Sequence, residues 1–262
     1  MKKKIAISLI LVLVLSLFAG CKSEPKMNLT KEEVLSGVSE NMRSLKSVTF
    51  AAKLDMQIAM SYMGEADSAV VQIDANGEYS GDPQALHFTA DLNADGDKQY
   101  GEAYLFFREG ETVSYTRSSP DGAFEQSVKK AKQSSSTKSV APLSDLDWQM
   151  ETADDRYILT HTLTEEDSKA LMAALGGVED LNELLSMDGL VNSDSGLAGV
   201  ALTMEVSPEL QLLGMSADFT PLVSQAFQLM PGIDTTGTRA VLSLTMDNHN
   251  SAIVIEPPEF ID

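Results

Sequence analysis

The first periodic segment of the chain, residues 28–47, has the spacing of an amphipathic helix. It opens with Thr30-x-x-Glu33, a capping box in which each side chain accepts a hydrogen bond from the other residue's backbone N–H. Apolar residues then recur at intervals of three and four, at Val34, Leu35, Val38, Met42 and Leu45. The pattern predicts a helix whose apolar stripe packs against the rest of the fold.

Beyond Val48 the period changes to two. Every second residue from Phe50 to Met60 is apolar, which indicates a strand with one face toward a core. Similar runs follow at 68–79, 86–92, 101–108, 111–117, 148–163, 200–206, 210–219, 240–246 and 252–255. Turn-forming segments separate several of these runs, such as NG at 76–77, GDP at 81–83 and EGE at 109–111, so a meander of antiparallel strands is predicted.

A short helical insert interrupts the strands. Thr164-x-x-Asp167 marks a helix start, Gly176-Gly177 a stop, and residues 181–185 a second short helix. The order of helix, strands, short helices and strands predicts an α+β fold with an antiparallel sheet.

One acidic stretch, residues 91–102, fits the spacing of a calcium-binding loop of the EF-hand type. Oxygen-bearing side chains stand at alternate positions, Gly96 supplies the turn and Glu102 closes the pattern. However, the flanking segments alternate with a period of two, whereas an EF-hand loop lies between helices. A β-hairpin turn is therefore favoured, and a weak cation site is the alternative.

The N-terminus carries an export signal. Three lysines precede an apolar run from Ile5 to Phe18 that is shorter than the roughly 20 residues of a transmembrane helix. An uncleaved anchor helix is the alternative. Phe-Ala-Gly-Cys, ending at Cys21, resembles the lipobox of bacterial lipoproteins, which implies that Cys21 is lipidated. We expect a lipoprotein signal peptide at 1–20, a polar tether at 21–28 and a single domain at 29–262.

The net charge and the absence of common motifs limit the classes of function that we expect. The 19 basic and 39 acidic residues give a net charge of −20, which makes nucleic acid a poor partner. The main basic cluster, residues 129–139, is interpreted as a polar surface loop. The sequence contains no common catalytic or nucleotide-binding motif, and its three histidines lie in separate segments without metal-ligand spacing. We therefore expect no enzyme activity, cofactor or metal.

The apolar strand face is the strongest candidate for a binding surface. Several of the thirteen methionines lie in the strand runs, and methionine suits surfaces that accommodate varied apolar shapes. Plain core packing is the alternative. The candidate ligand-lining residues are Phe50, Leu54, Met56, Ile58, Met60, Phe88, Leu105, Phe107, Leu202 and Met204.

Several segments of the sequence resemble those of a family of uncharacterised Gram-positive lipoproteins. They are the lipobox, MRSLKSVTFAAKLDMQIAM at 42–60, DWQMETADDRYILTHTL at 147–163 and IVIEPPEF at 253–260. That family is similar to the LolA/LolB and LppX/LprG superfamily. The resemblance implies an antiparallel sheet curved into an open half-barrel around helices, with a cavity for acyl chains.

Two functions follow as hypotheses. The first is a non-enzymatic lipoprotein, anchored at the outer face of the cytoplasmic membrane, that binds or carries a lipid or another hydrophobic ligand on the concave sheet face. The second is a cell-envelope interaction or sensor module whose core is filled by its own side chains. The sequence does not indicate a protein partner.

Overall fold

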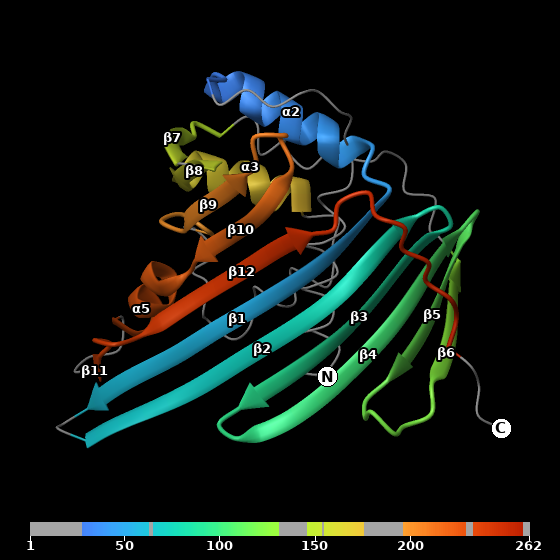
Figure 1. The fold of residues 1–262 in the computed structure, drawn as a ribbon. Helices are drawn as coiled ribbons and strands as arrows, with labels where there is room; N and C mark the ends of the chain where they lie inside the picture. Colours follow the sequence, from blue (N-terminus) through green and yellow to red (C-terminus); the bar gives the residue numbers. More distant parts are fainter. Residues whose placement is uncertain are drawn as a thin grey trace.

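An antiparallel sheet organises the computed structural model, which describes residues 28–62, 65–130, 146–153, 155–175, 196–228 and 233–258. Its strands are β1 (Ser47–Tyr62), β2 (Glu65–Gly81), β3 (Gln84–Ala94), β4 (Asp97–Arg108), β5 (Glu111–Arg117), β6 (Glu125–Lys130), β7 (Gln149–Ala153), β8 (Arg156–Thr162), β9 (Ala201–Val206), β10 (Leu212–Asp218), β11 (Ile233–Asp234) and β12 (Arg239–Asp247). The helices are α2 (Lys31–Arg43), α3 (Glu165–Leu175) and α5 (Thr220–Gln228). Figure 1 shows the long central strands side by side, with α2 at the β8–β10 end.

The strand order is β6-β5-β4-β3-β2-β1-β12-β10-β9-β8-β7, with β11 attached to β1. The pairing is antiparallel throughout this described sheet. Within the described residues, β6 pairs with β5 alone and β7 with β8 alone, so the sheet remains open. The predicted fold class, an α+β open half-barrel packed against an N-terminal helix and a short helical insert, is confirmed.

Several local expectations were wrong or incomplete. Residues 252–255 form no strand, and α5, β11 and β6 were not predicted. Lys129 and Lys130, expected in a loop, end strand β6. The rest of that expected loop, the helix expected at 181–185 and residues 1–27 lie outside the described residues.

Asn76-Gly77 was expected in a turn but lies inside β2, where a glycine is needed for packing. A β-carbon on Gly77 would lie 2.4 Å from Cζ of Phe50 and 2.5 Å from the backbone oxygen of His87. Both distances are shorter than any ordinary contact. The missing side chain therefore lets the Phe50 ring and strand β3 approach β2 closely.

The acidic stretch 91–102 is a hairpin, as favoured from its flanks. Ala94 pairs with Asp97, and the two residues between them have positive φ angles, 51° at Asp95 and 89° at Gly96. Such a two-residue turn matches the twist of the strands it joins. The Asp95 carboxylate accepts a hydrogen bond from the backbone N–H of Val70 at 2.7 Å, which ties the turn to β2.

Helix α2 begins at the predicted capping box and covers one end of the sheet. The backbone N–H of Thr30 donates to the Glu33 carboxylate at 2.8 Å, and the N–H of Glu33 donates to the Thr30 hydroxyl at 3.3 Å. The helix buries Val34, Leu35, Val38 and Met42 in a core shared with β1, β3, β8, β9, β10 and β12. We name the sheet face that carries Phe50 and packs against α2 the inner face, and the opposite side the outer face.

The C-terminal segment, residues 248–258, crosses the outer face instead of adding a strand. The backbone N–H of Asn250 donates to the oxygen of Ser47 at 2.8 Å. Further along, Ile253 and Ile255 pack on a separate apolar cluster formed by Ala85, Phe106, Val113 and Tyr115. Figure 1 shows this red segment running from the end of β12 across the neighbouring strands toward β5 and β6.

Candidate functional site

The inner face presents a row of apolar side chains on β1, the strand that contains five of the ten predicted ligand-lining residues. Alternate residues of a strand share a face, so Phe50, Leu54, Met56 and Ile58 stand on the inner side. The Met60 side chain lies outside the described residues, as does the predicted lipidation residue Cys21. These side chains therefore form an apolar surface that begins beneath α2 and continues along the strand.

Three predicted residues are buried in the main core. Phe88 is fully buried, and Phe50 and Met204 are nearly so, with 4% and 3% of their surfaces exposed. All three belong to the cluster that includes the buried side of α2. At this end of the sheet the protein's own helix covers the apolar face.

Six further predicted residues lie at or beyond the margin of that core. All six are partly buried. Leu54, Leu105, Phe107 and Leu202 pack against that core, and Met56 and Ile58 lie farther along β1. Apolar side chains therefore continue past the part of the sheet that α2 fills.

Neighbouring strands extend this surface sideways with residues that were not predicted. Leu54 stands opposite Ile73 of β2 and Leu242 of β12, and Met56 stands opposite Val71 and Ala240. Residues directly opposite in an antiparallel pair share a face, so the apolar row on β1 has apolar neighbours on both sides. The register that joins these residues depends on the pairing of β1 with β2 and with β12. Strand β12 lies far from β1 in the sequence, and periodicity alone does not align the two.

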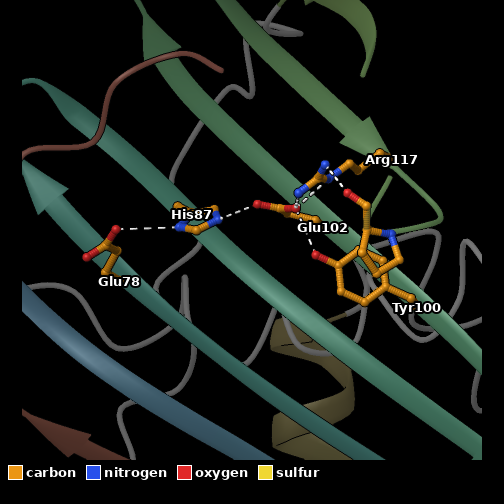
Figure 2. A network of polar contacts seen from close by, with 6 residues as sticks. Glu78, His87, Tyr100, Glu102 and Arg117 are labelled. Atoms are coloured by element: carbon orange, nitrogen blue, oxygen red, sulfur yellow. Dashed lines mark hydrogen bonds and ion pairs between the residues drawn. The ribbon is translucent and has the colours of Figure 1, made fainter. Parts of the chain in front are cut away.

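The outer face carries a network of polar side chains centred on Glu102 in β4, whose side chain is 7% exposed (Figure 2). Tyr100 donates to Oε2 of Glu102 at 2.8 Å, and Nε of Arg117 donates to the same oxygen at 2.6 Å. Nε2 of His87 lies 3.0 Å from Oε1 of Glu102, and Nδ1 of the same ring lies 3.4 Å from Oε1 of Glu78. The network thus joins four adjacent strands, β2 to β5.

The surroundings of Glu102 keep its carboxylate charged. Burial alone would raise the pKa of Glu102, but hydrogen bonds from Tyr100, His87 and Arg117, with the charge of Arg117, bring that pKa below its ordinary value. Conversely, burial and the Glu102 carboxylate raise the pKa of Tyr100. In this ion network Oε2 of Glu102 accepts from Tyr100 and Arg117, and Oε1 lies within hydrogen-bond distance of the His87 ring.

Aromatic rings surround this network. The His87 ring stacks on Tyr104 with centroids 4.1 Å apart and planes 16° from parallel. Phe124 meets the Tyr104 ring edge-on at 5.6 Å and lies beneath the Arg117 guanidinium, 4.7 Å away. Tyr104 and Phe124 both pack against the outer apolar cluster that holds Ile255, so the network and the C-terminal segment share neighbours.

The other two histidines have separate environments. His161 lies between the backbone oxygen of Asp147, 3.1 Å from Nδ1, and the carboxylate of Asp167, 3.0 Å from Nε2. Burial lowers the pKa of His249, whose Nε2 has no hydrogen-bond partner. In the part of the chain that the structure describes, no cluster of histidine, cysteine or acidic side chains is arranged to hold a metal ion.

Sequence reasoning missed the outer network, although two turns carry the signal for it. The turn at Asp82-Pro83 places Glu78 opposite His87, and the turn at Asp95-Gly96 places His87 opposite Tyr104. The sequence analysis considered Glu102 only as the last position of a calcium loop and did not relate it to His87. Counting residues outward from each turn would have placed Glu78, His87 and Glu102 on one face of neighbouring strands.

Comparisons with known proteins give the following. The chain is similar to the beta-barrel-like protein of domain of unknown function DUF1849 from Brucella abortus, with 9% identity and a TM-score of 0.29 over 80% of this chain and all of that one. It is also similar to a DUF1329 family protein from Desulfovibrio piger ATCC 29098, with 11% identity and a TM-score of 0.19 over 81% of this chain and 88% of that one. No curated protein matches the sequence.

No helix within the described ranges has the length and apolar character needed to cross a bilayer.

The family comparison covers more than half of the chain, including α2, strands β1 to β8 and α3. Residues 30–179 match the family of unknown function DUF6612, and the chain belongs to that family.

Proposed function

We propose that this protein is a lipid-anchored, extracytoplasmic lipoprotein that binds a lipid or another hydrophobic ligand on the inner face of its sheet. It binds or carries this ligand without catalysing a reaction. The anchor rests on the lipobox-like ending at Cys21, which would hold the protein at the outer face of the cytoplasmic membrane.

The observation that carries the proposal is the change in burial along one apolar row. Phe50 and Ala52 are buried, whereas Leu54, Met56 and Ile58 on the same face are only partly buried. Apolar surface left in contact with water is costly, at roughly 25 cal/mol for each Å². A hydrophobic ligand lying over these three residues would shield their apolar surface from water. The free energy gained in this way would contribute to its binding.

An interaction or sensor module with a filled core is the second candidate. It is favoured by Phe50, Phe88 and Met204, which the protein's own core already encloses. The two candidates differ in what the partly exposed residues do. In the first they touch a ligand, and in the second they have no role in binding one.

Two neighbouring residues of β1 provide a matched test, because Ile58 belongs to the inner row and Gln57 is exposed on the other side of the strand. Ile58→Glu and Gln57→Glu introduce the same charged side chain on opposite faces. The full chain would be purified from membranes, stripped of lipid, offered a fatty acid or a phospholipid, and measured by native mass spectrometry.

We expect stoichiometric lipid adducts on the wild type and on Gln57→Glu, and at least a tenfold loss on Ile58→Glu, since burying an unpaired carboxylate costs several kcal/mol. Circular dichroism would establish that both variants fold. A folded wild type that takes up neither lipid, or equal uptake by both variants, would refute the proposed binding face.

A further inference from the structure

Strand β6 forms one lateral edge of the described sheet, beyond β5 (Figure 1). Among the described residues it pairs with β5 alone, and all six of its residues are exposed. On an edge strand the backbone N–H and C=O groups of alternate residues point away from the sheet and can pair with another strand. Val128, an apolar residue of this strand, is 53% exposed. A further strand would therefore cover both backbone groups and apolar surface here.

The charges on β6 differ from those of the chain as a whole. The strand carries two lysines, Lys129 and Lys130, and one glutamate, Glu125, whereas the whole chain has 19 basic and 39 acidic residues. Lys130 lies opposite Glu111 of β5, but Lys129 and Glu125 lie opposite threonines. These two charges therefore have no charged residue directly opposite them in their own sheet.

A second copy of β6 can pair with the first through a two-fold axis perpendicular to the sheet. Directly opposite residues of an antiparallel pair share a face, so odd-numbered residues must lie opposite odd-numbered ones. An axis at Ser127 places Glu125 of each copy opposite Lys129 of the other, which makes two ion pairs by symmetry. The same register places the exposed Val128 of each copy beside Gln126 of the other.

We propose that this chain forms a two-fold symmetric dimer in which the β6 edges of two copies pair antiparallel, with Ser127 at the axis. An axis at Val128 would place neither lysine opposite a glutamate. Lysine on an edge commonly deters pairing, but in this register Glu125 of the second copy neutralises Lys129. The dimer joins two sheets into one, with both inner faces on the same side. Its formation depends on concentration, so sufficiently dilute protein unfolds as single chains.

Cysteine crosslinking tests the position of the axis. Opposite residues of an antiparallel pair have Cα atoms about 4.5–5.5 Å apart, within the range that a disulfide spans. Ser127→Cys in the full chain, treated with a mild oxidant on membranes, should therefore give a disulfide-linked dimer. Wild type, whose single cysteine is Cys21, provides the background.

Ser114→Cys is the matched control for this crosslink. It makes the same chemical change directly opposite Ser127 in β5, one strand farther from the axis. The two copies of this residue would be separated by three strand spacings of roughly 4.8 Å each, beyond the reach of a disulfide. We expect no dimer above the wild-type background.

Charge reversal tests the ion pairs. Glu125→Lys or Lys129→Glu alone creates two like-charge contacts across the axis, and the two substitutions together restore opposite charges at both. In sedimentation velocity of the full chain in detergent, each single variant should raise the dimer dissociation constant at least about tenfold. The double variant should return this constant to within about threefold of the wild-type value.

Glu151→Lys, at an exposed position of the opposite edge strand β7, alters the net charge as much as Glu125→Lys does and should leave the dissociation constant unchanged. A wild type that stays monomeric at every concentration would overturn the dimer. A Ser114→Cys crosslink as strong as that of Ser127→Cys, or a double variant no better than the single ones, would overturn the proposed register.

Discussion

At the scale of single residues, Glu102 is the centre of the polar network on the outer face. It accepts hydrogen bonds from Tyr100 and Arg117, lies within hydrogen-bond distance of His87, and is almost fully buried. Removing the charge of a buried acceptor leaves its donors without a strong partner. The whole network therefore depends on one ionised carboxylate.

Glu102→Gln should reduce the free energy of unfolding by about 2 kcal/mol at neutral pH, because hydrogen bonds to charged groups contribute roughly 1.5–3 kcal/mol. The pKa of Glu102 is lowered in the folded state, so its contribution is present above the ordinary glutamate pKa of roughly 4.3. That contribution disappears as the pH falls through the folded value.

Urea unfolding at about pH 7 and about pH 3 would measure this difference, with Glu125→Gln on the exposed strand β6 as the control. The wild-type advantage over Glu102→Gln should shrink in acid, whereas Glu125→Gln should match the wild type throughout. An advantage that is unchanged at the lower pH would mean that the carboxylate charge is not what stabilises the network.

At the scale of elements, the C-terminal segment is a stabilising part of the outer face. Ile255 is 4% exposed and packs on residues of β3, β4 and β5, whereas the preceding residue, Val254, is 73% exposed. The two residues are adjacent and similar in size, and they differ mainly in burial. Substitutions at these two residues therefore distinguish the loss of buried packing from the general effect of shortening an apolar side chain in this segment.

Ile255→Ala should lower the free energy of unfolding by about 2 kcal/mol, at the low end of the range for buried isoleucine because a terminal segment can relax around the gap. Hydrogen exchange at the Asn250 amide, which bonds to Ser47, should speed up at least tenfold. Val254→Ala should leave both quantities unchanged. Equal effects of the two substitutions would show that the segment is not held by Ile255.

The elements that periodicity predicted are those with strong, regular patterns. Strands β1 to β5, β12 and helix α2 each have a clear period and an identifiable turn or cap, and these were found to within a few residues. The capping box at Thr30 and the hairpin at Asp95-Gly96 were predicted from local chemistry and are confirmed. Local sequence patterns are enough to predict an element when nearby residues, such as a helix cap or a turn, define where it begins or ends.

Other elements depend on contacts that the local sequence does not reveal. The run 252–255 alternates like a strand, yet it lies across the outer face and forms no ladder. Strand β6 has all six residues exposed, so no buried face marks it. Similarly, Gly77 resembles a turn residue, but the ring of Phe50 fills the space beside it. In each case the deciding partner lies far away in the sequence.

At the scale of the whole molecule, the two faces of the sheet differ in chemistry. Around the middle of β1 the inner side carries Leu54 and Met56, while the outer side carries Lys53 and Asp55 in ion pairs with Asp74 and Arg239. The outer face thus meets water, in keeping with the chain's net charge of −20. The proposed hydrophobic ligand would bind on the inner face, where this part of β1 carries apolar side chains in place of the ion pairs on its outer side.

Photo-crosslinking tests this central claim most directly. A fatty acid with a photoreactive group in its chain would be bound to the full protein, irradiated, and the labelled peptides identified by mass spectrometry. We predict labels on the inner-face residues Leu54, Met56 and Ile58, with competition by unlabelled fatty acid. Labels confined to outer-face residues of the same strands, or no labelling that unlabelled fatty acid displaces, would contradict the account.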